Sequence, residues 1–124
     1  MLERTLEPGL GGDWARMRKR WLVGIDWCRS DPPALKRLAD MANSEIRIPN
    51  GGSLVASAGC TPRDTFHPKL FVFAAPSAYA VICGSGNLSA NGFSRGCEVG
   101  SFLLVNRASA NEATIAEEVA GLLE

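Results

Sequence analysis

A histidine and a lysine stand two residues apart in an otherwise apolar stretch, at His67 and Lys69. The stretch 66–74 predicts a strand, and residues two apart in a strand project on the same face. A buried imidazole or ammonium group is costly unless it has a partner, and one phosphate group would serve both. Without further signals, a lone His in a buried strand is more often a hydrogen-bonded core residue.

A polar loop rich in glycine follows the next predicted strand. Residues 84–89 read GSGNLS, and the glycines allow the backbone to approach a ligand closely. Ser85, Asn87 and Ser89 supply hydroxyl and amide groups, and such a loop at a strand end can form a cup for phosphate oxygens. Glu98 then opens another predicted strand, where its carboxylate could orient an imidazole through a ring N–H. Taken singly, these features also occur in ordinary turns and strand ends.

The order H-P-K, then G-S-G-N, then Glu, within 32 residues, resembles the phospholipase D superfamily. The signature of that family is H-x-K, followed by G-S-x-N and an acidic residue on the next strand. The segments 65–70 and 84–93 look most like the nuclease-type members, which carry a single H-x-K motif. The resemblance covers residues 21–105 and implies an α/β fold, a mixed β-sheet flanked by helices.

The resemblance also implies a role for each matching residue. His67 would be the nucleophile that forms a covalent phosphohistidine, and Glu98 would support it. Lys69, Asn87 and Ser85 would hold the phosphate oxygens. Family chemistry of this kind uses no metal and no cofactor. Ala74 stands where many members carry an Asp, which weakens a lipase-type assignment more than a nuclease-type one.

The family mechanism needs two imidazoles, but the chain has one His and no internal repeat. A second copy related by a two-fold axis would supply the other imidazole. The sequence therefore predicts a metal-independent phosphodiesterase, most simply a nuclease acting on DNA or RNA, with one composite site in a homodimer. Three alternatives stay open: phospholipid hydrolysis, a non-catalytic binding or dimerisation module, and a fragment of a larger defence or restriction protein.

Residues near other predicted loops are candidate substrate contacts. Ser89 and Arg95 join Ser85 in this group, and Arg95 is the best cation because it lies between the GSGN loop and Glu98. Arg29 and Arg63 are weaker candidates. Trp27 could stack on a base, although Trp is found more often in cores and interfaces.

The balance of charge limits the attraction for a polyanion. Lys and Arg total 13, as do Asp and Glu, so the chain has no bulk positive field. A local patch would have to act instead. A basic helix is predicted from Asp13 to Arg20, either as a solvated face or as a phosphate-binding patch.

Cysteine usage and hydropathy predict a cytoplasmic protein. The four cysteines form no C-x-x-C pair, so we expect reduced, mostly buried thiols and no zinc site. No apolar run reaches the length of about 18 residues that a membrane span requires. The first residues do not resemble a secretory signal.

The elements that must position these residues follow from the apolar pattern. Residues 1–20 are expected to form an arm with a short helix, and 21–124 a single phosphodiesterase domain. A helix capped by Ser30 or Asp31 should pack Leu38 on a sheet, and a second helix is predicted at 112–123. Strands are predicted at 21–26, 45–49, 66–74, 79–83 and 98–105, with a weaker one at 54–58.

Overall fold

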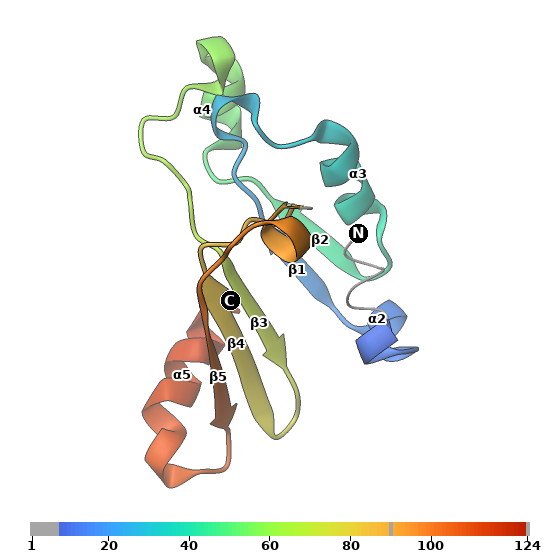
Figure 1. Cartoon of the computed structure of the whole chain (residues 1–124), viewed down its shortest axis with the longest axis vertical. Coiled ribbons are helices and arrows are strands. Elements are labelled where there is room, and N and C mark those ends of the chain that lie inside the picture. The colour runs from blue at the N-terminus through green and yellow to red at the C-terminus, as the bar shows by residue number, and fades with distance from the viewer. Residues whose placement is uncertain (1–7, 90, 124) are drawn as a thin grey trace. The chain divides into compact units, whose positions relative to one another are not determined.

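The computed structural model describes residues 8–89 and 91–123 (Figure 1). The chain divides into two compact units, Met1–His67 and Pro68–Glu124, each with its own β-sheet. The elements of the first are α2 (Asp13–Arg16), β1 (Lys19–Leu22), η1 (Asp26–Cys28), α3 (Pro32–Asp40), β2 (Ser44–Arg47), α4 (Gly51–Ala56) and η2 (Ala58–Cys60). Those of the second are β3 (Leu70–Ala74), β4 (Ala78–Gly84), η3 (Asn91–Arg95), β5 (Gly100–Asn106), η4 (Ala110–Glu112) and α5 (Ala113–Gly121). The predicted mixture of helices and strands is confirmed. Residues 1–7 of the expected N-terminal arm lie outside the described residues.

The first unit is built on a strand–helix–strand motif, as predicted. β1 and β2 are parallel, with Lys19 opposite Ser44 and Leu22 opposite Arg47. The intervening helix α3 begins with two prolines, which fit the first turn because its N–H groups have no helical acceptor. Asp31 caps this turn by accepting a hydrogen bond from the backbone N–H of Ala34 (3.2 Å).

Lys19 is a buried lysine that the sequence did not single out, with 6% of its surface exposed. Its ammonium group donates to the carbonyl oxygens of Met17 and Ala42, at 3.0 Å each. It also lies 4.7 Å from the ring centroid of Trp14, a cation–π contact. Lys19 therefore ties the segment before β1 to the segment that leads into β2.

Substitution of Lys19 by Met should lower the free energy of unfolding by about 1–3 kcal/mol, because the partly buried carbonyl groups of Met17 and Ala42 lose their donor. Urea denaturation of the two proteins measures the difference. Lys36→Met is the control: that lysine is exposed on α3 and pairs with Asp40, so its loss should change stability by less than about 0.5 kcal/mol. Equal effects of the two substitutions would show that the buried contacts of Lys19 contribute nothing.

The predicted basic helix is wrong beyond Arg16. The chain leaves the helix at Met17, and Lys19 and Arg20 belong to β1, which starts two residues earlier than predicted and ends at Leu22. The parallel ladder with β2 outweighs the helical preference of the basic residues. Arg18 and Arg47 lie 3.6 Å and 2.7 Å from Glu45, and the hydrogen bond from Arg47 lowers the pKa of that carboxyl group. The cations are thus partly neutralised by neighbouring acids.

The predicted strand at 54–58 is also wrong. Residues Gly51–Ala56 form the helix α4, which follows Asn50 in the left-handed conformation. The helix buries Leu54 (3% exposed) and leaves Val55 exposed (73%), so its apolar residues do not alternate as in a half-buried strand.

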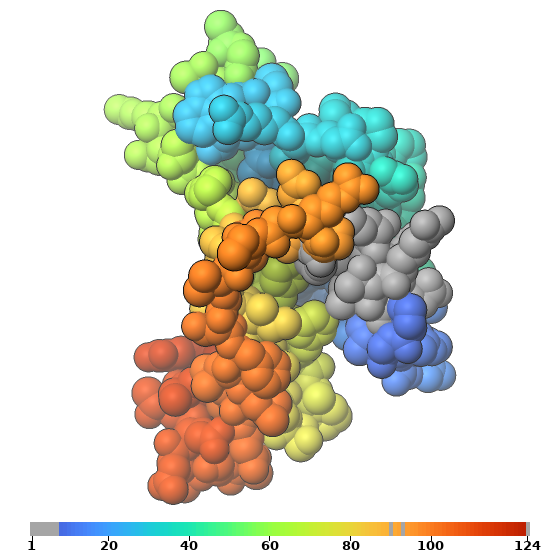
Figure 2. Space-filling model, in the orientation of Figure 1, coloured from blue at the N-terminus to red at the C-terminus, as the bar shows by residue number. Residues whose placement is uncertain are grey.

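The second unit is a three-stranded antiparallel sheet in the order β3-β4-β5, with α5 against one face. The core consists of Tyr79, Val81, Val105 and Val119, and Val105 is 1% exposed. The helix α5 adds Ala116, Ala120 and Leu123 to this core, whereas Ile115 and Leu122 are 40% and 59% exposed. Only some of the apolar residues of this helix therefore pack on the core. The segment that leads into β5 lies at the surface (orange in Figure 2).

Two predicted strands of this unit start too early. β3 begins at Leu70 rather than at residue 66, because Pro68 has no N–H to give to a ladder. His67 and Lys69 therefore precede the strand, and strand alternation does not place them on one face. β5 begins at Gly100, two residues after Glu98.

The predicted burial of the cysteines is wrong as well. Cys28, Cys83 and Cys97 are exposed and Cys60 is half-buried, all as free thiols. Their places in turns, at a strand end and in a loop account for this, since such positions lie at the surface. Within residues 8–89 and 91–123, no helix has the length and apolar character needed to cross a membrane.

Candidate functional site

Three of the predicted site residues lie at one edge of the sheet in the second unit, namely the edge at which the ends of its strands meet. Lys69 precedes β3, Ser85 follows β4, and Glu98 lies just before β5. Because the strands are antiparallel, the start of β3, the end of β4 and the start of β5 meet at the same edge. The register proves the point: Leu70 pairs with Cys83 and Gly84 pairs with Gly100, while the N–H of Gly84 donates to the carbonyl of Lys69 (3.2 Å).

Ser85 and Glu98 are in direct contact at this edge. The Ser85 hydroxyl donates to Oε2 of Glu98 at 2.5 Å and accepts the backbone N–H of Val99 at 3.1 Å. The backbone N–H of Ser85 in turn donates to the carbonyl of Val99 (2.9 Å). These bonds continue the β4–β5 pairing beyond the last ladder residues and hold the Glu98 carboxylate in place. The resemblance had assigned Ser85 to phosphate oxygens, whereas here its proton goes to Glu98.

Glycines give the chain the room that this contact requires. A Cβ atom at Gly84 would lie 2.5 Å from the carbonyl oxygen of Val99, a distance that forces the strands apart. At Gly96 it would lie 3.1 Å from Oε1 of Glu98, and at Gly86 3.5 Å from Cγ of the same residue. The glycines of the loop thus let backbone approach the carboxylate closely.

The described part of the loop between Ser85 and Glu98 contains a helical turn. Residues Asn91–Arg95 form the π-helical turn η3. The Ser89 hydroxyl accepts the N–H of Gly92 (3.1 Å), and the carbonyl of Asn87 accepts the N–H of Ser89 (2.8 Å). Asn87 and Arg95 are exposed and Ser89 is half-buried. The turn therefore leaves an amide and a guanidinium at the surface in the segment that connects the two contacting residues.

Substitution of Ser85 by Ala should reduce any activity of this site about tenfold, since Glu98 loses a hydrogen bond worth about 1.5 kcal/mol. The reduction should fall on the turnover number, because the carboxylate is misplaced rather than removed. Initial rates on a phosphodiester measure it. Ser77→Ala is the control: Ser77 is an exposed serine in the turn at the opposite edge of the sheet and should leave the rate unchanged. A Ser85→Ala protein with full activity would show that this contact has no functional role.

The remaining motif residue, His67, belongs to the first unit. His67 is exposed and is the last residue of the first unit, whereas Lys69 is half-buried and belongs to the second. Just before His67, the backbone N–H of Phe66 donates to Oδ2 of Asp26 (2.9 Å). The His67 segment is thus anchored within the first unit.

Three further candidate substrate contacts lie in the first unit: Trp27, Arg29 and Arg63. Trp27 is 47% exposed and has a left-handed backbone (φ 52°), and the guanidinium of Arg29 lies 5.7 Å from its ring centroid. A Trp in that conformation is uncommon outside tightly held turns. Arg63 is an exposed residue in a bend.

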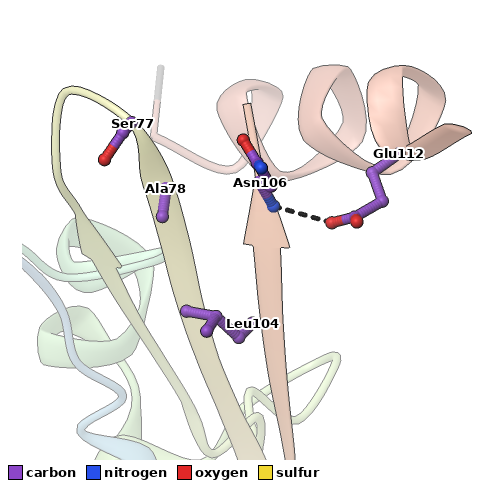
Figure 3. A pocket seen from close by; sticks show the side chains of 5 residues that line it. All are labelled: Ser77, Ala78, Leu104, Asn106 and Glu112. Carbon is purple, nitrogen blue, oxygen red and sulfur yellow. Dashed lines mark hydrogen bonds between the residues drawn. The ribbon is translucent and has the colours of Figure 1, made fainter. Parts of the chain in front are cut away.

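The cavity in Figure 3 is remote from the candidate site. It is a shallow hollow of about 350 Å³ between the start of β4 and the end of β5, lined by Ser77, Ala78, Leu104, Asn106 and Glu112. These residues lie at the sheet edge opposite Ser85. The Glu112 carboxylate accepts the backbone N–H of Asn106 at 2.6 Å and so caps the end of β5.

The part of the chain that the structure describes contains no group of three or more His, Cys, Asp or Glu side chains arranged as metal ligands. No family model, curated protein or solved structure matches this chain.

Proposed function

We propose that the chain is a metal-independent phosphodiesterase with a fold like that of the phospholipase D superfamily, and that its substrate is a nucleic acid. The observation that carries this proposal is the meeting of Lys69, Ser85 and Glu98 at one edge of a sheet, next to the ends of three separate strands. These residues occur in the order of the H-x-K, G-S-x-N and acidic motifs. A cation, a polar loop and a fixed carboxylate at one edge are groups that can bind and orient a phosphate diester.

The chemistry follows from the residue types. A ring nitrogen of His67 attacks phosphorus, and the bond from phosphorus to the leaving oxygen breaks. Lys69 and the Asn87 amide stabilise the charge on the non-bridging oxygens, while Glu98 holds an imidazole in the required tautomer. A second imidazole gives its proton to the leaving oxygen. It then takes a proton from water, which attacks phosphorus, frees the monoester and restores His67.

The second imidazole is the reason to propose a homodimer. The chain holds one His, so another copy must supply the other. The strand β5 is an outer strand of its sheet, and its residues Phe102 and Leu104 are 65% and 62% exposed. Exposed apolar side chains on a sheet edge are typical of surfaces that bind protein. They favour association of the chain along β5.

The test is hydrolysis of bis(p-nitrophenyl) phosphate and of linear DNA by the full chain in excess EDTA. The proposal predicts that chelation leaves the rate unchanged and that the protein sediments as a dimer. A folded, dimeric protein that cleaves neither compound would be the non-catalytic module instead. Cleavage that stops on chelation and returns with Mg²⁺ would contradict the metal-independent mechanism.

A further inference from the structure

Two cysteines that are 32 residues apart in the sequence meet in the first unit. The Sγ atoms of Cys28 and Cys60 are 2.7 Å apart, and Cys28 donates its S–H proton to Cys60. Both are free thiols; Cys28 is exposed and Cys60 half-buried. A small oxidant can therefore reach the pair, and the two sulfurs can be joined with little movement of the backbone.

Both thiols are carried by tight turns that aim them at each other. Cys28 ends η1 and Cys60 ends η2, and each has a left-handed backbone, with φ of 53° and 51°. Residues other than Gly adopt this conformation only where the surroundings hold it. Here the N–H of Cys28 donates to Ile25 (3.0 Å) and the N–H of Cys60 to Ser57 (3.4 Å). The contact between the thiols thus results from two defined turns.

The turn that carries Cys28 also holds the segment before His67. Asp26, the first residue of η1, accepts the backbone N–H of Phe66. A Cβ atom at Gly24 would lie 3.0 Å from the carbonyl oxygen of Phe66, so the two segments are closely packed. A covalent link at Cys28 would therefore stiffen a turn that contacts the neighbour of His67.

We propose that Cys28 and Cys60 form a reversible dithiol–disulfide site whose oxidant is a small-molecule disulfide such as oxidised glutathione. This inference does not rest on the proposed phosphodiesterase function.

The thiol contact assigns the order of the two exchange steps. Cys28 donates its S–H proton to Cys60, which raises the pKa of the Cys28 thiol, and we therefore assign the first attack to Cys60. The Cys60 thiolate attacks one sulfur of the oxidant, and the other sulfur leaves as a thiolate that takes up a proton. The Cys28 sulfur, on losing its proton, then attacks the Cys60 sulfur of the mixed disulfide and expels the second small thiol. Two protein thiols are oxidised, and one small disulfide is reduced to two thiols.

The remaining cysteines provide the matched controls. Cys83 and Cys97 are exposed, like Cys28, but belong to the second unit. They report what exposure alone does to a thiol in this chain. A bound metal explains the pair less well, because the described residues contribute no third ligand of the His, Cys, Asp or Glu type.

The test is peptide mapping of the full chain after equilibration with oxidised glutathione and capping of the remaining thiols with iodoacetamide. The expected product links Cys28 to Cys60, is reversed by dithiothreitol and is unchanged in a Cys83→Ser, Cys97→Ser protein. In Cys28→Ser, glutathione should stay on Cys60. In Cys60→Ser, where no second thiol can resolve the mixed disulfide, glutathione should stay on Cys28. Phenylarsine oxide, which bridges two close thiols, should protect the same pair in the reduced protein.

The same mapping of the wild-type protein in urea needs no variant, so its result does not depend on whether the variants fold. The preference for the Cys28–Cys60 link should be present in the native wild-type protein and disappear on unfolding. Glutathione spread equally over all four cysteines of the native protein, without a link, would overturn the proposal. So would a Cys28–Cys60 link that is as frequent in urea as in buffer.

Discussion

Replacing His67 by Ala is expected to abolish phosphodiester hydrolysis in excess EDTA, with a loss of about 10³-fold or more. The imidazole is the only one in the chain, so its removal eliminates both the nucleophile and the acid of a two-fold composite site. His67 is exposed, so the substitution should leave the free energy of unfolding almost unchanged. Initial rates on bis(p-nitrophenyl) phosphate measure the loss, and urea unfolding checks the fold. A His67→Ala protein that retains a tenth of the activity would exclude His67 as the nucleophile.

Mixed dimers extend this prediction to the second imidazole. When wild-type and His67→Ala chains are co-refolded in equal amounts, only dimers with two wild-type chains have a complete composite site. Activity should therefore fall to about one quarter of the wild-type value, not to one half. An activity of one half would mean that each chain acts alone, which contradicts the shared site.

Substitution of Glu98 by Gln should reduce the rate about 10²-fold, the second largest effect that we expect. Glutamine keeps the size of the side chain and can still accept the proton of Ser85, so the change removes the negative charge and little else. Without that charge, an imidazolium formed during proton transfer loses its partner. Rates over a range of pH measure the effect, which should appear in the turnover number.

Glu112→Gln is the matched control for Glu98. Its carboxylate also accepts a hydrogen bond near one end of β5, from the backbone N–H of Asn106, but at the opposite edge of the sheet. We expect full activity from this variant and a modest loss of stability. If both glutamine variants lose activity equally, the effect of Glu98 is structural and its assignment to the site is wrong.

The parts of the fold that could be predicted depend on local chemistry. Asp31 before two prolines predicts the start of a helix, because the cap and the first turn are set by neighbouring residues. The apolar run at 79–83 predicts a strand, and β4 extends it by one residue at each end. These signals do not need distant partners.

The errors in the predicted fold arise where a distant segment or a single residue determines the local structure. Lys19 and Arg20 were assigned to a helix because their pairing with β2 cannot be seen in local sequence. The run 54–58 favours strand by composition but packs as a helix on one buried leucine. The early start predicted for β3 overlooked the missing N–H of Pro68.

The candidate site was predictable as a set of residues but not as a set of contacts. The motif order predicts that Lys69, Ser85 and Glu98 belong together, and the antiparallel register explains why they share an edge. The hydrogen bond that gives the Ser85 proton to Glu98 has no signal in the sequence, since a loop serine can donate in many directions. The meeting of Cys28 and Cys60 was equally hidden, because two turns with unusual backbones produce it.

The most direct test of the phosphodiesterase account is to trap the covalent intermediate. The full chain would be mixed with a ³²P-labelled diester in excess EDTA, quenched in alkali within one turnover and digested for peptide mapping. We predict label on the peptide that contains His67, stable in alkali and lost in acid, as for a phosphohistidine. Turnover of the diester without labelled protein, or with label on another residue, would contradict the account.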